Sequence, residues 1–99
     1  MSPEEFHRYW RVEHAAKVRS IPAAAKYIRR YVQAHTLDTE YAASNPSYDG
    51  TAELWFDSVD DKNAFFSDPE YLAKIAPDER VFADMNQTQF LVTNEEEVM

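Results

Sequence analysis

The sequence contains no cysteine, and no apolar run in it approaches the length of a membrane-spanning helix. Without cysteine, the chain forms no disulfide, uses no thiolate nucleophile and builds no cysteine-ligated metal site. Positive charge is also scarce, because 10 Lys and Arg residues stand against 18 Asp and Glu residues, for a net charge of −8. A surface this acidic repels phosphate backbones and anionic lipid, so we expect neither nucleic acid nor a membrane as a partner. No signal peptide opens the chain, and we expect a cytoplasmic protein.

Glycine occurs once and no segment is of low complexity, whereas six Tyr, six Phe and two Trp are available for a core. This composition is typical of a folded chain. We expect one domain spanning residues 1–99, because a chain this short cannot divide into two cores. A domain this small buries a limited fraction of its surface, so we also expect a homodimer.

Most of the basic residues crowd into the first third of the chain, as Arg8, Arg11, Lys17, Arg19, Lys26, Arg29 and Arg30. Such a cluster either binds an anionic small molecule or, more commonly, forms the solvated faces of a helix and a strand. Both interpretations stay open at this point.

A first helix is predicted to begin after Ser2, whose side chain can accept a bond from the amide of Glu5. Pro3 suits the first helical position, where its missing N–H costs nothing. The helix is expected to end at residues 20–22, because Pro22 disfavours helix in the residue before it. One face of it carries Phe6, Tyr9, Trp10 and His14.

A period of two predicts strands at residues 26–37 and 51–57, with Tyr31 and His35 on one face of the first. Residues 38–50 between them are rich in Asn, Ser, Asp and Pro, which predicts a loop with turns. In the second strand, Leu54 and Phe56 share one face, and Glu53 lies on the other.

The remainder is predicted to be helical until a last strand. Ser58 precedes Asp61 by three residues, which marks the start of a helix that carries Phe65 and Phe66. A further turn with Tyr71 and Ile75 leads to a short helix at residues 78–84, and alternation predicts a strand at residues 88–93. The order fits an α+β fold: a ferredoxin-like antiparallel sheet covered by helices on one face, without its opening strand.

Four segments resemble the EthD family of the dimeric α+β barrel superfamily. They are Ser2-Pro3-Glu4-Glu5-Phe6 with Trp10 and His14, then residues 31–35, residues 49–56 and residues 78–84. The resemblance implies monomers that pair sheet to sheet. It also implies cofactor-free isomerisation, decarboxylation or dehydration of small aromatic, lactone or polyketide compounds, in catabolism or secondary metabolism.

Members of that family begin with a strand that lies inside the sheet, and here Met1 adjoins the helix start. Two strand edges would stay unpaired without it. We expect that the natural product carries this strand upstream, or that a partner chain or a shifted strand takes its place.

His14 is the predicted general acid or base. It ends a helical face behind Phe6 and Trp10, and burial against aromatic rings favours the neutral imidazole, which abstracts protons near neutral pH. By resemblance it matches the catalytic histidine of a lactone isomerase of the superfamily, whose cysteine is replaced here by Leu54. A core histidine bonded to a backbone carbonyl is an equally good interpretation.

Tyr31 and His35 are candidate secondary catalytic groups, and more often such residues are packing partners in a dimer interface. Glu53 either contributes to the site or pairs with Arg29 or Arg30. The expected substrate-binding residues are Phe6, Trp10, Glu53, Leu54, Phe56 and Phe82.

We expect neither a metal nor a cofactor. His7 and His14 lie two helical turns apart, and His35 with Glu53 would supply only two ligands. Haem-binding relatives keep a histidine in the second half of the unit, and no histidine follows His35. The predicted function is therefore a cofactor-independent isomerase, decarboxylase or dehydratase that uses His14. The alternative is a non-catalytic, dimeric module that binds a small ligand.

Overall fold

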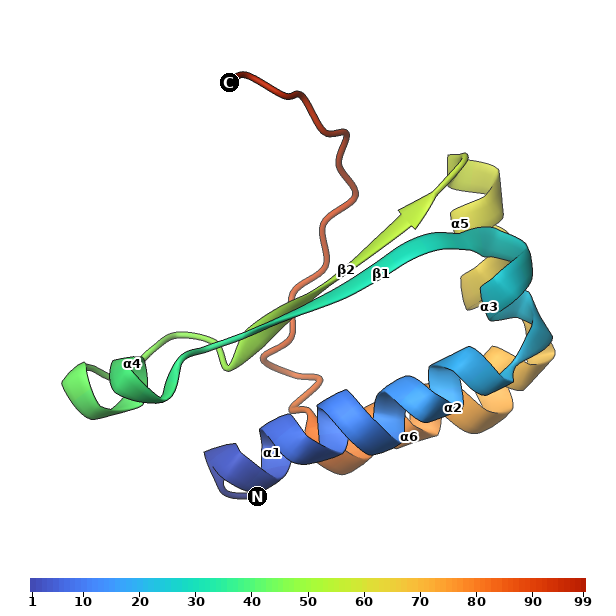
Figure 1. Ribbon diagram of the computed structural model, residues 1–99. Helices are drawn as coiled ribbons and strands as arrows, with labels where there is room; N and C mark the ends of the chain where they lie inside the picture. Colours follow the sequence, from blue (N-terminus) through green and yellow to red (C-terminus); the bar gives the residue numbers. More distant parts are fainter.

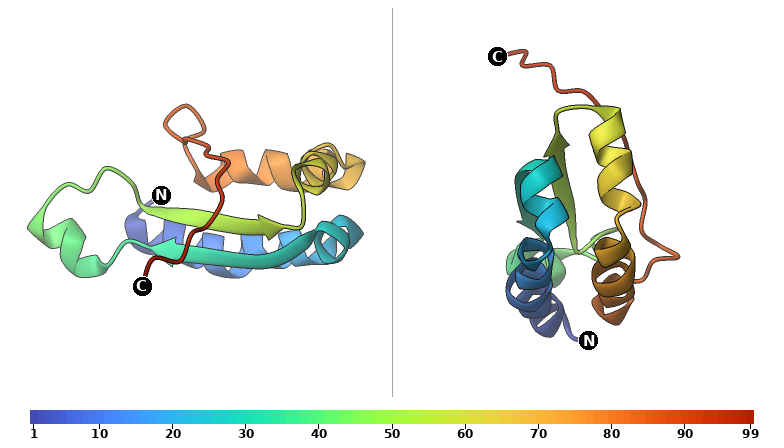
Figure 2. Two further views of the ribbon diagram at one scale, coloured as in Figure 1. Left: turned by 90° about the horizontal axis from the view of Figure 1, so that it is seen from above. Right: turned by 90° about the vertical axis from the view of Figure 1, so that its right-hand side faces the viewer.

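The computed structural model describes all 99 residues as two helical stacks joined by a β-hairpin (Figure 1). The elements are α1 (Pro3–Arg8), η1 (Tyr9–His14), α2 (Ala15–Ser20), α3 (Pro22–Tyr27), β1 (Ile28–His35), α4 (Asp38–Ala43), β2 (Gly50–Phe56), α5 (Val59–Phe66), η2 (Tyr71–Ile75) and α6 (Ala76–Phe82). The stack α1–η1–α2 contacts the stack η2–α6, and both lie on the same side of the hairpin (Figures 1 and 2). The α+β class, with an antiparallel sheet covered on one face, is confirmed.

The first helix begins as predicted, since the amide of Glu5 donates to Ser2 Oγ at 3.2 Å. Its middle part, η1, is π-helical, with the amide of Ala15 bonded to the carbonyl of Trp10. A π-turn widens the helix and re-aims the side chains around it, and such turns are frequent at functional sites. Ile21 has extended backbone and ends the helix before Pro22, as predicted.

Two short helices correct the prediction for the first strand and the loop. Lys26 belongs to α3 and not to the strand, because Pro22 opens a new helical turn and three alanines continue it. Residues 38–43 form α4 within the expected loop, where Asp38 and Glu40 favour the positive end of the helix. Strand β1 is therefore confined to Ile28–His35.

The hairpin pairs β1 with β2 in an antiparallel register that sets Tyr31 opposite Leu54 and Gln33 opposite Ala52. No third strand is present: the predicted strand at residues 88–93 is wrong, because those residues are irregular and Leu91 is 87% exposed. Alternating side chains form a strand only where another strand bonds their backbone. Residues 88–93 bond neither strand of the hairpin, and β2 pairs with β1 alone.

The core is small and lies at one end of the molecule. Its buried members are Val18, Ile21, Ala23, Phe65, Tyr71 and Ile75. The helix that supplies Phe65 begins as predicted, with the amide of Asp61 donating to Ser58 Oγ at 3.0 Å. Only 11 of 99 residues are buried, so the chain alone gains little stabilisation from apolar burial.

Candidate functional site

His14 lies at the end of η1, between the first helix and α6, and only 5% of it is exposed. Its Nδ1 is 2.8 Å from Oδ2 of Asp78, which is 4% exposed. The ring of Phe82 packs against the imidazole at a centroid distance of 4.7 Å. The structure therefore buries His14 as predicted, but its polar partner is a carboxylate.

Asp78 is bonded by three side chains of the first helical stack. Its Oδ1 accepts from the Tyr9 hydroxyl at 2.5 Å and from Lys17 Nζ at 2.7 Å. Burial by itself raises the pKa of Asp78, but the hydrogen bonds from Lys17, Tyr9 and His14 outweigh it and lower that pKa. In turn, the hydrogen bond to Asp78 is the main cause that raises the pKa of both Lys17 and Tyr9. Asp78 is thus a carboxylate at neutral pH.

The carboxylate fixes the tautomer of His14. A carboxylate only accepts, so the proton of a neutral His14 sits on Nδ1 and the lone pair sits on Nε2. No protein group bonds Nε2 of His14. Every side-chain nitrogen or oxygen that is fully buried in this chain has a hydrogen-bond partner, so the unbonded Nε2 must be reachable by solvent. An imidazole held in this way can take a proton at Nε2 while the carboxylate stabilises the resulting cation.

A second polar network covers the helix-facing side of β1. Gln33 Nε2 donates to the carbonyl of Trp10 and to the Tyr31 hydroxyl, both at 2.9 Å. This orientation directs Gln33 Oε1 to Nε2 of His35, which donates to it at 2.9 Å. Burial, followed by the nearby charges of Arg11 and His7, lowers the pKa of His35. Burial is also the main cause that raises the pKa of Tyr31.

His7 extends this network to the tip of the hairpin. Nδ1 of His7 is 2.7 Å from Nδ1 of His35, and its Nε2 is 3.0 Å from the Tyr41 hydroxyl. That hydroxyl donates to Asp49 at 2.6 Å. Burial and then Asp49 raise the pKa of Tyr41 to about 12, so it stays protonated.

A row of aromatic rings separates the two networks. From His14 the rings run through Phe82, Phe6 and Trp10 to His35, with successive centroid distances of 4.7, 5.7, 5.4 and 4.5 Å. Phe6 therefore packs against both Trp10 and Phe82, and these three are among the expected substrate-binding residues. The structure places His14 at one end of this row and His35, with Tyr31 nearby, at the other.

The remaining predicted residues lie elsewhere. Leu54 and Phe56 pack against the core cluster. Glu53 is exposed opposite Val32, on the face away from the helices, and it pairs with neither expected arginine. Arg29 bonds Asp57 at 2.8 Å, and Arg30 lies 4.6 Å above the ring of Trp55. The expected ion pair of Glu53 is thus wrong.

The sequence reasoning missed most partners of the histidines. One signal for His7 was available, since a residue two turns before an inward His14 lies on nearly the same helical face. Asp78, Tyr41 and Asp49 carry no such local signal, because tertiary packing alone brings them to the histidines. No three His, Asp or Glu side chains converge in a way that would hold a metal ion.

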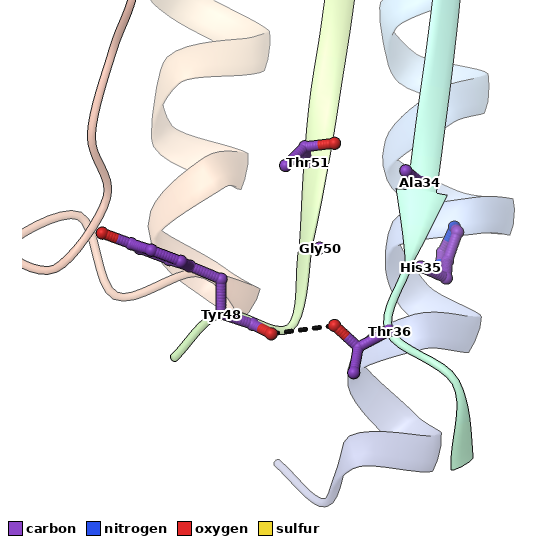
Figure 3. Close-up of a pocket in the computed structure, with 6 residues that line it drawn as sticks. All are labelled: Ala34, His35, Thr36, Tyr48, Gly50 and Thr51. Atoms are coloured by element: carbon purple, nitrogen blue, oxygen red, sulfur yellow. Dashed lines mark hydrogen bonds between the residues drawn. The ribbon is translucent and has the colours of Figure 1, made fainter. Parts of the chain in front are cut away.

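Two hollows open beside β1. One, of about 230 Å³, lies at the hairpin end and is lined by Ala34, His35, Thr36, Tyr48, Gly50 and Thr51 (Figure 3). There Thr36 Oγ1 donates to the carbonyl of Tyr48 at 2.8 Å, and the side chains of Tyr48 and His35 point to opposite sides. The other, of about 310 Å³, is lined by Arg11, Ala15, Arg19, Tyr31, Gln33 and His35.

Comparison with known protein families matches residues 1–86 to the EthD domain, which has the dimeric α+β barrel fold. No curated protein and no solved structure matches the chain. None of its helices combines the length and the apolar character needed to cross a membrane. The family match spans the hairpin and both histidine networks, and the chain belongs to the EthD family.

Proposed function

We propose that this protein is a cofactor-independent acid–base catalyst for a small aromatic, lactone or polyketide-like metabolite, of the isomerase, decarboxylase or dehydratase type. His14 is the proton acceptor and donor. The observation that carries the proposal is the bond between His14 Nδ1 and the buried Asp78, which leaves Nε2 without a protein partner. Orientation by a buried carboxylate is the arrangement that general-base histidines use in unrelated enzymes.

The bonds to Asp78 explain how the pair would work. Lys17 and Tyr9 hold the carboxylate in one position and in its charged form. When Nε2 takes a proton from substrate, the imidazolium gains the full attraction of that carboxylate in a partly dry environment. Tyr31 and His35 would act as secondary polar groups from the far end of the aromatic row. Glu53 has no part in this mechanism.

His14→Asn tests the proposal sharply. The asparagine amide can still donate to Asp78 from the position of Nδ1, but it removes the basic nitrogen at Nε2. We expect turnover of an accepted lactone or aromatic substrate to fall by about 100-fold or more. Incorporation of deuterium from heavy water at the reacting carbon should fall with it, while the melting temperature changes little. The exposed Val12→Ala variant on the same helix is the control, and full activity in His14→Asn would overturn the mechanism.

One observation favours a second candidate, a non-catalytic module that binds a small ligand. Asp78 ties Tyr9, His14 and Lys17 to α6, and a purely structural joint would need the same three bonds. If the wild-type protein and His14→Asn both bind a small aromatic, lactone or polyketide-like compound, and neither protein converts it, this candidate replaces the first.

We also propose that the working unit is a homodimer paired through the sheet faces. The fold of the family is dimeric, and the isolated chain buries few of its residues. The hairpin face away from the helices presents Trp55 beside Arg30. Light scattering should give twice the 11.5 kDa mass of the chain, and a monomer at micromolar concentration would contradict the proposal.

A further inference from the structure

We infer that the hollow lined by Arg11, Ala15, Arg19, Tyr31, Gln33 and His35 binds the carboxylate group of a small organic ligand. This Arg11–Arg19 hollow lies between the first helical stack and β1. His14 does not line it, so the inference does not depend on the proposed catalytic pair.

The charge of the lining is the first support. Arg11 and Arg19 form no ion pair, although the chain carries 18 acidic residues and a net charge of −8. Three other basic residues of the same region do pair with acids: Arg8 with Glu13 at 2.9 Å, Lys17 with Asp78 at 2.7 Å and Arg29 with Asp57 at 2.8 Å. Lys26 and Arg30 form no ion pair, but neither lines the hollow. No Asp or Glu lines the hollow. The lining is therefore positive, and the one carboxyl whose charge reaches it is Glu79, which acts on Tyr31 from outside the hollow and is bonded by the Tyr71 hydroxyl.

The free hydrogen-bonding groups are the second support. Both ends of the Gln33 amide and both nitrogens of His35 are already bonded within the protein. The Tyr31 hydroxyl accepts from Gln33, and its own proton bonds no protein atom. Its raised pKa keeps that proton in place at neutral pH. What remains free is a set of donors, the two guanidinium groups and one hydroxyl, which is the complement of an oxyanion.

The spacing of the arginines sets the kind of ligand. Arg11 and Arg19 are two helical turns apart, about 12 Å along the axis, and the small Ala15 lies between them. Long arginine side chains can converge over an alanine on one carboxylate, which guanidinium groups bind with paired bonds. A volume of about 310 Å³ is near the lower limit for small-molecule sites, and the Tyr31 ring offers a flat apolar wall. A carboxylate on one aromatic or aliphatic ring fits these dimensions.

The test is a titration of the whole protein with benzoate, followed by heteronuclear NMR of backbone amides and arginine side chains. Benzamide is the neutral probe of the same shape, and inorganic phosphate is the probe for an oxyanion without a ring. We expect benzoate to shift the signals of Arg11, Arg19 and Tyr31, and we expect benzamide to leave them unchanged. If phosphate displaces benzoate at equal concentration, the organic part of the inference is overturned.

Matched variants locate the site. Arg11→Gln and Arg19→Gln should each weaken benzoate binding by about tenfold, while Arg30→Gln, which removes the same charge beside Trp55, should not. Equal weakening by Arg30→Gln would show a general charge effect and overturn the site. His14→Asn should leave benzoate binding intact, so failure of the catalytic proposal and failure of this one give different results.

A bound carboxylate should also raise the pKa of His35, because it opposes the positive charge of Arg11 that lowers it. The imidazole C–H signals of His35 report this pKa directly. A pKa that stays constant on saturation with benzoate would place the ligand elsewhere.

Discussion

His14 and His35 lie on the two sides of the first helical stack, and the charged groups around them differ in sign. Toward α6, His14 meets a buried carboxylate that also receives Lys17 and Tyr9. Toward β1, His35 meets an amide and another histidine, and the charges that act on it are both positive. The first network places a carboxylate directly against its histidine, whereas in the second no carboxylate bonds His35. The two networks lie on opposite sides of the first helical stack, and a row of aromatic rings lies between them.

The largest effect is expected where the internal counter-charge is removed. Asp78→Asn leaves Lys17, Tyr9 and His14 without the buried carboxylate that they share. Loss of one partner from a buried charged network costs about 3 kcal/mol of unfolding free energy. Urea denaturation monitored by tryptophan fluorescence measures this cost.

Glu96→Gln is the control, since it makes the same carboxylate-to-amide change in the exposed, irregular tail. If both variants unfold at the same urea concentration, the Asp78 network contributes nothing to stability. The contrast between the two sides of the stack would then be geometric only.

A smaller effect is expected at the boundary between the networks, where Gly50 lies against the ring of Trp10. A Cβ at Gly50 would lie 2.3 Å from the Ala34 carbonyl oxygen and 2.7 Å from the Trp10 ring, closer than either can approach. Gly50→Ala should therefore displace Trp10, whose carbonyl orients Gln33. Such crowding costs about 1–3 kcal/mol.

Chemical shifts show which side responds to Gly50→Ala. We expect the signals of Gln33 and His35 to move and those of His14 to stay. Ala52→Val, which enlarges an exposed position of the same strand, is the control. Equal movement on both sides would mean that the aromatic row couples the networks instead of separating them.

Features set by neighbouring residues were predictable from the sequence. Ser2 and Ser58 cap their helices as expected, and the period of two correctly placed Tyr31 and His35 on one face and Glu53 on the other. Features that need a distant partner were not predictable. Residues 88–93 alternate like a strand yet have no strand to pair with, so pattern alone misassigned them.

The candidate site shows the same division. Helical spacing correctly predicted that His14 is buried. It indicated neither that the imidazole faces α6 instead of the sheet nor that its partner is Asp78, which lies 64 residues away in the chain. The composition indicated an anionic ligand only as one of two interpretations. Composition does not show which basic residues lie together. The structure shows that Arg11 and Arg19 line one hollow whose lining has no carboxylate.

The smallest effect concerns pH, and it separates the two sides without altering their packing. The pKa of His35 is lowered in the folded protein, so the unfolded chain binds this proton more strongly. The stability that depends on neutral His35 is present above about pH 6.5 and is lost as pH falls toward the lower folded value. Asp78 has a lowered pKa and stays charged throughout this window. Unfolding free energies between pH 7.5 and about 5.5 should therefore decline less in His35→Asn than in the wild type. Arg11→Gln should also flatten the decline, because it removes a positive charge that disfavours the protonated His35 ring. If the stability curves of the wild type, His35→Asn and Arg11→Gln superimpose, the pKa of His35 does not depend on Arg11.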